Sequence, residues 1–289
     1  MLSYQHEYHF GNHADLLKHS TLALVLQALN EKPKPYTVID AHAGSGRYSL
    51  ADEKNQKTGE AADRITRVLR YFMEENSKNN AIYDYLLLCQ RYAGEGFYPG
   101  SPEIARCFSR TGDKIILMEL HPQEFSTLSV NMKLPVISGN GGASVSVHRR
   151  DSWEGIAALT PPEYKRGLLL IDPSYEEDSD YENAAKCAEL MKKRWNTGIV
   201  CIWYPLLQHR KLEIATLKSR CANCVREGSD RGVLCAEFCV KSEEESGLYG
   251  SGMIVINPPW KLDEKLKNAL DFLSRAIPES RFSVNELLN

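Results

Sequence analysis

The stretch Gly167 to Tyr175 joins a strand-forming run to residues that could do chemistry. Gly167 to Ile171 is apolar and short, and Asp172, Pro173, Ser174 and Tyr175 follow it directly. An aromatic amine is a poor nucleophile because its lone pair is delocalised into the ring. The Asp172 carboxylate and the Pro173 carbonyl could accept its two hydrogens, and the carboxylate could take the surplus proton. Tyr175 could stack on an extruded base. The stretch therefore predicts a site that activates an amino group of a base.

The same four residues resemble the Asp/Asn-Pro-Pro-Tyr/Phe motif of amino-group methyltransferases, with Ser174 in place of the second proline. A rival, Asn257-Pro258-Pro259-Trp260, matches the motif more literally. We favour Asp172, because the strand before Asn257 is expected to run antiparallel to the others. Its carboxyl end would then lie at the opposite edge of the sheet, away from the cofactor.

Alternating patterns along the chain predict the elements that position Asp172. Five strand patterns are separated by helical ones: Tyr36 to Asp40, Lys114 to Leu120, Val145 to His148, Gly167 to Ile171 and Ile199 to Trp203. This rhythm predicts a mostly parallel sheet with helices on both faces. Two further patterns, 233–240 and 252–256, follow each other and should pair antiparallel. The fold class is therefore α/β: a Rossmann-like class I methyltransferase fold with a seven-stranded sheet that ends in an antiparallel hairpin.

A polar, helical stretch from about residue 52 to 96 interrupts this rhythm, with amphipathic segments at 60–72 and 81–92. It predicts an inserted helical subdomain at 51–97, between residues 1–50 and 98–289 of the methyltransferase core. Asn12 or Asp15 could cap a helix that runs to Leu29, and Ser101 before Pro102 predicts a second helix N-cap.

Ligands of open α/β sheets bind beyond the carboxyl ends of the strands. The turn after the first strand contains Gly44 and Gly46, where the backbone could approach a ligand, although a structural turn explains them equally well. Glu119 could accept hydrogen bonds from both ribose hydroxyls of a nucleoside. Asp151 could bind an adenine amino group. The alternatives are surface carboxylates or helix caps, and Asp151 could equally cap a helix at Trp153.

Composition limits the possible partners. With 43% hydrophobic and 25% charged residues the chain is an ordinary globular protein, and no apolar run could cross a membrane, so we expect a cytoplasmic protein. The net charge of -3 provides no general attraction to nucleic acid. Any RNA binding must come from local basic patches, each of which could instead be a solvated helix face. The candidates are Arg64 with Arg67 and Arg70, Lys165 with Arg166, Lys192 to Arg194, and Arg210 with Lys211.

Cysteine and histidine spacings do not favour a metal. Cys235 and Cys239 would lie about 13 Å apart on one strand, too far to share a zinc ion with Cys221 and Cys224. The histidines at 6, 9, 13 and 19 match no familiar ligand pattern. We expect no metal site.

Several motifs resemble those of the RlmJ family, the bacterial 23S rRNA adenine-N6 methyltransferases. The resemblance begins with Met1 to His6 and Gly11 to His19 and spans nearly the whole chain. The further matching stretches are 40–48, 98–102, 119–122, 203–205 and 250–262.

This resemblance implies S-adenosylmethionine as cofactor and a specific adenine of 23S rRNA as substrate. The implied cofactor-site residues are His19, His42, Gly44, Gly46, Ser101, Glu119, Asp151, Ser152 and Asp172. The implied catalytic residues are Asp172, Pro173 and Tyr175. Tyr4, His6, Lys18 and Tyr175 would contact the substrate adenosine or close over the cofactor. Two positions depart from the family: Ser174 replaces a proline, and Ser152 replaces a glycine.

From the resemblance we expect a monomer that acts on protein-free 23S rRNA or on an early assembly intermediate. Two alternatives remain open at this point. One is a DNA adenine-N6 or protein methyltransferase that uses the same motif. The other, suggested by Ser174, is a nucleic-acid-binding module that retains the fold without catalysis.

Overall fold

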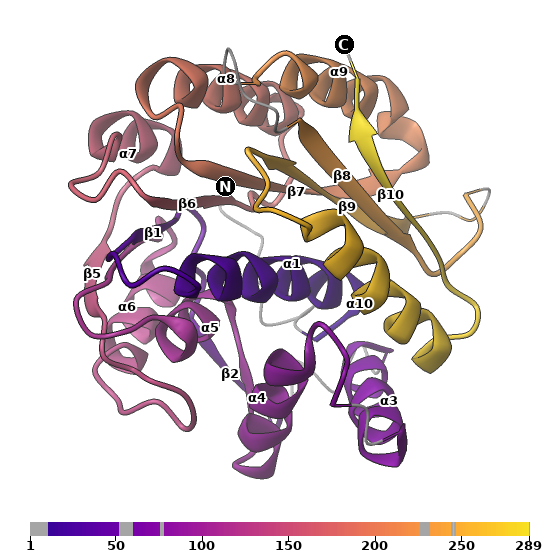
Figure 1. The fold of residues 1–289 in the computed structure, drawn as a ribbon. Helices are drawn as coiled ribbons and strands as arrows, with labels where there is room; N and C mark the ends of the chain where they lie inside the picture. The colour runs from indigo at the N-terminus through magenta and orange to yellow at the C-terminus, as the bar shows by residue number, and fades with distance from the viewer. Residues whose placement is uncertain are drawn as a thin grey trace.

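The computed structural model describes residues 11–51, 60–75, 78–225, 232–243, 245 and 247–288. Its centre is an eight-stranded sheet in the order β10-β8-β9-β7-β6-β1-β4-β5 (Figure 1). The strands are β1 (Thr37–Asp40), β4 (Lys114–Met118), β5 (Ser144–His148), β6 (Gly167–Ile171), β7 (Ile199–Leu207), β8 (Val233–Cys239), β9 (Leu248–Ile256) and β10 (Arg281–Leu287). Neighbours from β5 through β4, β1 and β6 to β7 pair in parallel.

Strands β9 and β10 give the sheet its antiparallel part. β9 pairs antiparallel with both β7 and β8, and β10 pairs antiparallel with β8. The predicted α/β methyltransferase-like fold and its hairpin are therefore confirmed, but the sheet has eight strands rather than seven. β10 was not predicted because it is an edge strand in which only Val284 is buried. Its sequence therefore lacks the apolar alternation that marks a strand.

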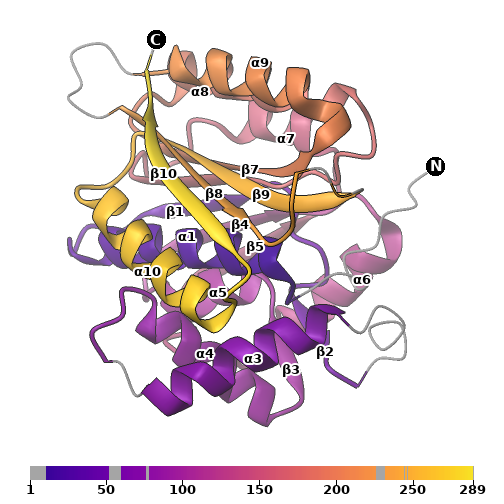
Figure 2. The ribbon, with the colours of Figure 1, turned by 90° about the vertical axis from the view of Figure 1, so that its right-hand side faces the viewer.

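Helices cover both faces of the sheet (Figure 2). On one face lie α1 (His13–Asn30), α5 (Ser101–Phe108), α6 (Pro122–Asn131) and α10 (Leu262–Ala276); on the other lie α7 (Ser152–Leu159), α8 (Ser179–Arg194) and α9 (Lys211–Ala222). Successive residues of β6 alternate between the two cores, because side chains of a strand point to opposite faces. Leu168 and Leu170 pack with α1, whereas Leu169 and Ile171 pack with α8. Every residue of β6 is thus buried, which fixes the place where Asp172 leaves the sheet.

The helical insertion leaves and rejoins the core through a small second sheet. β2 (Arg47–Ser49) pairs antiparallel with β3 (Phe97–Pro99), and α3 (Glu60–Glu75) and α4 (Tyr83–Gly94) lie between them in the chain. Phe72 of α3 and Leu86 of α4 belong to the same apolar core as α1 and α10. The division at 51 and 97 therefore stays a prediction.

Two local predictions at helix starts had different outcomes. The Asn12 side chain accepts hydrogen bonds from the amides of Ala14 and Asp15, which confirms it as the cap of α1. The prediction that Ser101 is an N-cap is wrong, because Gly100 holds that position and Ser101 is already the first helical residue. Among the described residues, no helix combines the length and apolarity that crossing a membrane requires.

Candidate active site

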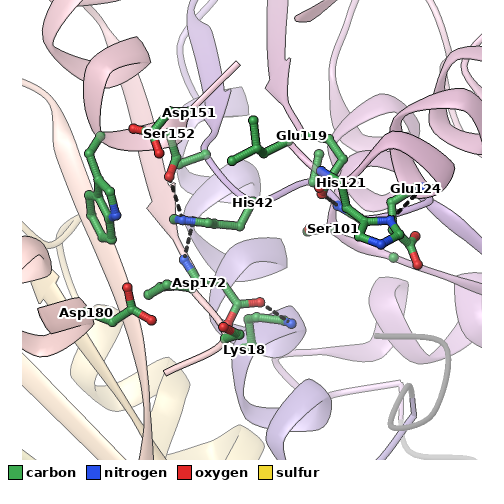
Figure 3. A pocket seen from close by; sticks show the side chains of 18 of the residues that line it. Lys18, His42, Ser101, Glu119, His121, Glu124, Asp151, Ser152, Asp172 and Asp180 are labelled. Carbon is green, nitrogen blue, oxygen red and sulfur yellow. Dashed lines mark hydrogen bonds and ion pairs between the residues drawn. The ribbon is translucent and has the colours of Figure 1, made fainter. Parts of the chain in front are cut away.

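A cavity of about 230 Å³ opens at the carboxyl ends of the parallel strands (Figure 3). The segments that follow β1, β4, β5 and β6 line it, together with α1 and the start of α5. Ten of the residues predicted for the site line this cavity: Lys18, His19, His42, Gly44, Ser101, Glu119, Asp151, Ser152, Asp172 and Pro173. The cavity therefore lies where we expected it from the sequence, beyond the carboxyl ends of the parallel strands.

A buried ion-pair network joins α1 to the end of β6. The Lys18 Nζ lies 2.5 Å from Asp172 Oδ2 and 2.9 Å from Asp15 Oδ1. Burial works against the charge of Lys18, but the two carboxylates outweigh it and raise its pKa. Lys18 therefore stays a cation and holds the Asp172 carboxylate at the cavity wall (Figure 3).

A second chain of hydrogen bonds fixes the backbone of Asp172. Its amide donates to His42 Nδ1 at 3.1 Å, so that nitrogen carries no proton. Burial, together with the charge of Lys18, lowers the pKa of His42 to about 3, and the ring is neutral. The ring proton then sits on Nε2, which donates to Ser152 Oγ at 2.8 Å. Ser152, His42 and Asp172 thus form one line across the cavity (Figure 3).

Glu119 anchors the turn after β1. Its two carboxylate oxygens accept hydrogen bonds from the Gly44 amide at 2.8 Å and from the His121 amide at 2.7 Å. Burial raises the pKa of Glu119, and these backbone donors oppose the rise. Gly44 has a φ of 56°, in the left-handed region that glycine adopts readily. The carboxylate is therefore held at the cavity wall with acceptor lone pairs to spare.

Asp151 is a helix cap, as one of the two predictions from the sequence had it, and its contact with an adenine amino group stays a prediction. Its Oδ1 accepts a hydrogen bond from the Glu154 amide at 3.0 Å and so caps α7. The same residue lines the cavity, beside Ser152 and Trp153. The cap holds the carboxyl group in place at the end of β5.

The structure does not bring every predicted residue to the cavity. Tyr175 is only 6% exposed, packs against Tyr181 and Trp203, and donates its hydroxyl to the Trp203 carbonyl at 2.6 Å. Its ring therefore offers no stacking face to the cavity. Gly46 also lies away from the cavity, where a side chain would collide with Met132. The predicted contacts Tyr4 and His6 lie outside the described residues.

Two acids at or beside the cavity were not predicted. Asp40 is the last residue of β1, just as Asp172 follows β6, and it is 1% exposed. Burial raises its pKa to about 6, against the opposing effects of the Ser101 hydroxyl and the His42 amide. Asp180 at the start of α8 lines the cavity, and burial raises its pKa. Asp40 could have been found by treating every acid at a strand end alike, whereas Asp180 lies in α8, beyond the end of β6, and has no such signal.

The rival motif lies at the other edge of the sheet. Asn257 follows β9, which runs antiparallel to β7, and its amide donates to the carbonyls of Asn196 and Gly198 just before β7. Trp260 is 80% exposed. The topological prediction that separated Asp172 from Asn257 is confirmed.

Metal ligands do not gather in the part of the chain that the structure describes. Within it, no group of three or more His, Cys, Asp or Glu residues is arranged to hold a metal ion. None of the described cysteines forms a disulfide, and all but Cys239 are buried. Burial raises their pKa values, so they are unreactive thiols that pack in the core.

Known proteins resemble this chain over almost its whole length. Residues 33–286 match the family described as ribosomal RNA large subunit methyltransferase D, RlmJ. The ribosomal RNA large subunit methyltransferase J of Escherichia coli is 35% identical over 283 residues, which cover 96% of this chain and 95% of that protein. The enzyme of the same name from Haemophilus influenzae has the same identity and coverage.

A solved structure supports the same relationship. The crystal structure of a Legionella pneumophila protein matches this fold with a TM-score of 0.82 and 28% sequence identity. The match covers 96% of this chain and 98% of that one. This chain therefore belongs to the RlmJ family of ribosomal RNA large subunit methyltransferases.

Proposed function

We propose that the protein transfers a methyl group from S-adenosylmethionine to the exocyclic N6 of a specific adenine in 23S rRNA. The observation that carries this proposal is the position of Asp172 and Pro173 at the end of β6. There they line the same cavity as Glu119 and Asp151. Membership of a family named for methylation of large-subunit ribosomal RNA supports the substrate class.

The donor set of the cavity fits S-adenosylmethionine, which supplies a methyl group on a positively charged sulfur. Glu119 presents a carboxylate to the cavity, which suits a ribose with two adjacent hydroxyls. Carboxyl groups of Asp151, Asp172 and Asp180 also line the cavity and give it a negative potential that suits a cation. We assign His19, His42, Gly44, Ser101 and Ser152 to the same site because they complete the wall.

Asp172 and Pro173 would act on the substrate amine. The Asp172 carboxylate and the Pro173 carbonyl accept the two N6 hydrogens and localise the nitrogen lone pair. Asp172 then takes the proton that the nitrogen loses on methylation. Lys18 holds this carboxylate in position before the reaction. Because its ring is buried, Tyr175 supports this loop in our proposal, and Tyr4 and His6 remain predicted substrate contacts.

An acceptor comparison tests the proposal. Tritiated S-adenosylmethionine is incubated with the protein and protein-free 23S rRNA, DNA or a protein mixture in parallel reactions. We expect label in the RNA, and mass spectrometry of the digested RNA should identify N6-methyladenosine at one position. Label only in DNA or in protein would support the alternative methyltransferase and contradict ours.

Calorimetry separates an enzyme from a non-catalytic binding module. The wild-type protein should bind S-adenosylmethionine, and Glu119→Gln should weaken this binding, since an amide offers one acceptor oxygen rather than two. Binding of rRNA without any heat of binding for S-adenosylmethionine would identify the protein as a non-catalytic nucleic-acid-binding module and contradict the proposal.

A further inference from the structure

The turn 257–261, at the edge of the sheet opposite the cavity, presents a tryptophan to solvent. The side chain of Trp260 is 80% exposed, whereas tryptophan in folded proteins is usually largely buried. Asn257 and Lys261, on either side of it, have positive φ values of 56° and 59°, which are strained for residues other than glycine. Two main-chain carbonyls before β7 accept hydrogen bonds from the Asn257 amide and hold the turn in this conformation. Because strained backbone is often found at binding sites, we looked for a surface that the indole ring could serve.

Four loops at this edge contact one another and form one surface, which we call the basic edge. They are 31–36 before β1, 160–166 before β6, 195–198 before β7 and the turn 257–261. Asn257 bonds to the loop 195–198, and the Thr197 hydroxyl of that loop donates to the Lys165 carbonyl at 3.2 Å. Arg166 Nη1 in turn donates to the Lys34 carbonyl at 2.7 Å. The loop 31–36 and the start of α10, which follows Trp260, therefore lie on the same side of the molecule (Figure 2).

The basic edge has more positive charge than its acids neutralise. Glu31 and Glu163 are the only acids in the sequence of the four loops. Glu31 is paired with Lys265 of α10 at 3.3 Å, and Glu163 is paired with Lys114. Three exposed lysines of these loops belong to none of the ion pairs formed by described residues: Lys32, Lys34 and Lys165. A cation that neutralises no carboxylate can bind an anion from a partner.

Two guanidinium groups beneath the surface support the loop 31–36 and add to its positive potential. Arg110 and Arg166 both lie over the ring of Tyr36, at 5.4 and 5.8 Å from its centroid. Arg110 is paired with Asp113, whereas Arg166 donates to main-chain carbonyls at the end of α1 and in the loop. The charge of Arg166 is therefore not neutralised by these contacts.

We propose that the basic edge binds a segment of 23S rRNA that is remote from the target adenine. An unpaired base stacks on Trp260, and backbone phosphates bind Lys32, Lys34 and Lys165. This inference rests on the proposed function and adds a second place at which the protein holds its substrate. An exposed aromatic ring beside cations without acidic partners is the combination that binds single-stranded nucleic acid, because it suits both a base and its backbone. It also supplies the local attraction to RNA that a net charge of -3 does not.

The basic edge and the cavity are far enough apart to act separately. The five residues of β6 lie between the loop 160–166 and Asp172, which is a length of about 17 Å. A folded ribosomal RNA can span this distance, whereas a single nucleotide cannot. Loss of the basic edge should therefore raise the KM for 23S rRNA and leave kcat unchanged.

Binding of protein-free 23S rRNA by Trp260→Ala tests the stacking contact. We expect about tenfold weaker binding, since stacking of one base contributes affinity of this order. The slope of log affinity against log salt should not change, because the variant removes no charge. Trp260→Phe should restore most of the affinity, because it keeps an aromatic face. Leu212→Ala, which removes another apolar side chain that is 78% exposed, should bind the RNA like wild type.

The variant Lys34→Gln/Lys165→Gln tests the phosphate contacts. Its affinity for the RNA should fall, and its salt slope should be smaller by roughly 0.7 for each phosphate that the variant no longer neutralises. The control is Lys186→Gln/Lys211→Gln, which removes the same charge from two lysines that are paired with Glu182 and Glu243. The control should keep the wild-type affinity and salt slope.

Two readouts separate the basic edge from the cavity. Every variant should retain the wild-type affinity for S-adenosylmethionine and the wild-type kcat at saturating RNA. Wild-type RNA affinity in either Trp260→Ala or Lys34→Gln/Lys165→Gln would overturn this RNA surface while the proposed function stands, and would leave a protein as the partner of this edge. An equal loss of affinity in the control lysine variant would also overturn it. A wild-type protein that neither binds nor methylates 23S rRNA would overturn both proposals.

Discussion

Two proline turns that resemble the same motif lie at opposite edges of the sheet. Asp172-Pro173 follows the parallel strand β6, lines the cavity and has its carboxylate paired with a buried lysine. Asn257-Pro258 follows the antiparallel strand β9, and its amide bonds to two main-chain carbonyls. The first turn thus combines charge with access to a ligand, whereas the second is a satisfied strand terminator.

Strand direction, rather than a literal match to the motif, therefore decides which of the two turns can be catalytic. Ligands gather beyond the carboxyl ends of parallel strands, where the loops of several strands converge. A turn after an antiparallel strand lies at the other edge, away from the acids that line the cavity. The comparison predicts that changes at position 172 affect the reaction and changes at position 257 affect stability.

Asp172→Asn should produce the largest effect. The amide keeps one acceptor oxygen but cannot take the proton of the amine, and loss of general-base action costs about 100-fold or more in kcat. Lys18 keeps Asp15 as a partner, so the variant should fold. Single-turnover methylation of 23S rRNA measures the rate. A rate within a few-fold of wild type would remove the distinction between the two turns.

Lys18→Met tests the charge at the first turn. Removing the buried cation leaves the carboxylates of Asp15 and Asp172 without their counter-charge, which should cost roughly 3 to 5 kcal/mol in the free energy of unfolding. Urea denaturation measures the loss. An unchanged free energy of unfolding would show that the ion pairs of Lys18 with Asp15 and Asp172 do not stabilise the fold.

The raised pKa of Asp40 should make the stability of the protein depend on pH. Since burial raises its pKa from 3.8 to about 6, the folded protein retains a proton that the unfolded chain releases between these values. Stability should therefore fall as the pH rises through this window, by roughly 3 kcal/mol. Urea denaturation across the window should show a flatter profile for Asp40→Asn than for wild type. Parallel profiles would contradict the raised pKa.

Asn257→Ala provides the matched change at the opposite edge. It removes two hydrogen bonds and places alanine at a φ of 56°, which together should cost roughly 2 kcal/mol in stability. The methylation rate of the folded fraction should equal that of wild type. A substantial fall in rate with unchanged stability would give the second turn a role in the reaction.

Ser152→Ala should have the smallest effect. Without the Ser152 hydroxyl the His42 ring loses the acceptor of its Nε2 proton, and the amide of Asp172 is held less firmly. We expect a few-fold lower kcat with little change in affinity for S-adenosylmethionine. Nitrogen NMR should show His42 protonated on Nε2 in both proteins, because the Asp172 amide still donates to Nδ1, but with a shifted Nε2 resonance in the variant. An unchanged Nε2 resonance together with a wild-type kcat would contradict this positioning role.

The sequence predicted the fold best where local pattern and burial agree. β6 is apolar at every position because both faces are covered, and the acid that follows it stands out. β10 could not be seen, since an edge strand with one buried residue has almost no apolar pattern. Its position depends on pairing with β8, a contact between segments more than 40 residues apart.

The site was predicted at the level of which residues gather, but not of how they point. Glu119, Asp151 and Asp172 were found because each follows a strand. The inward turn of Tyr175 could not be found, because it depends on a positive φ of 55° and on a carbonyl of β7. The pairing of Arg64 with His13 likewise arises from the packing of α3 on α1, which no local pattern encodes.

The most direct test of the central claim is a crystal structure of the protein with S-adenosylhomocysteine and adenosine 5′-monophosphate. We predict that the adenine N6 lies about 3 Å from a carboxylate oxygen of Asp172 and from the Pro173 carbonyl. The lone pair of the adenine N6 should point toward the sulfur of S-adenosylhomocysteine. A base bound with N6 remote from Asp172, or a sulfur bound outside this cavity, would contradict the account.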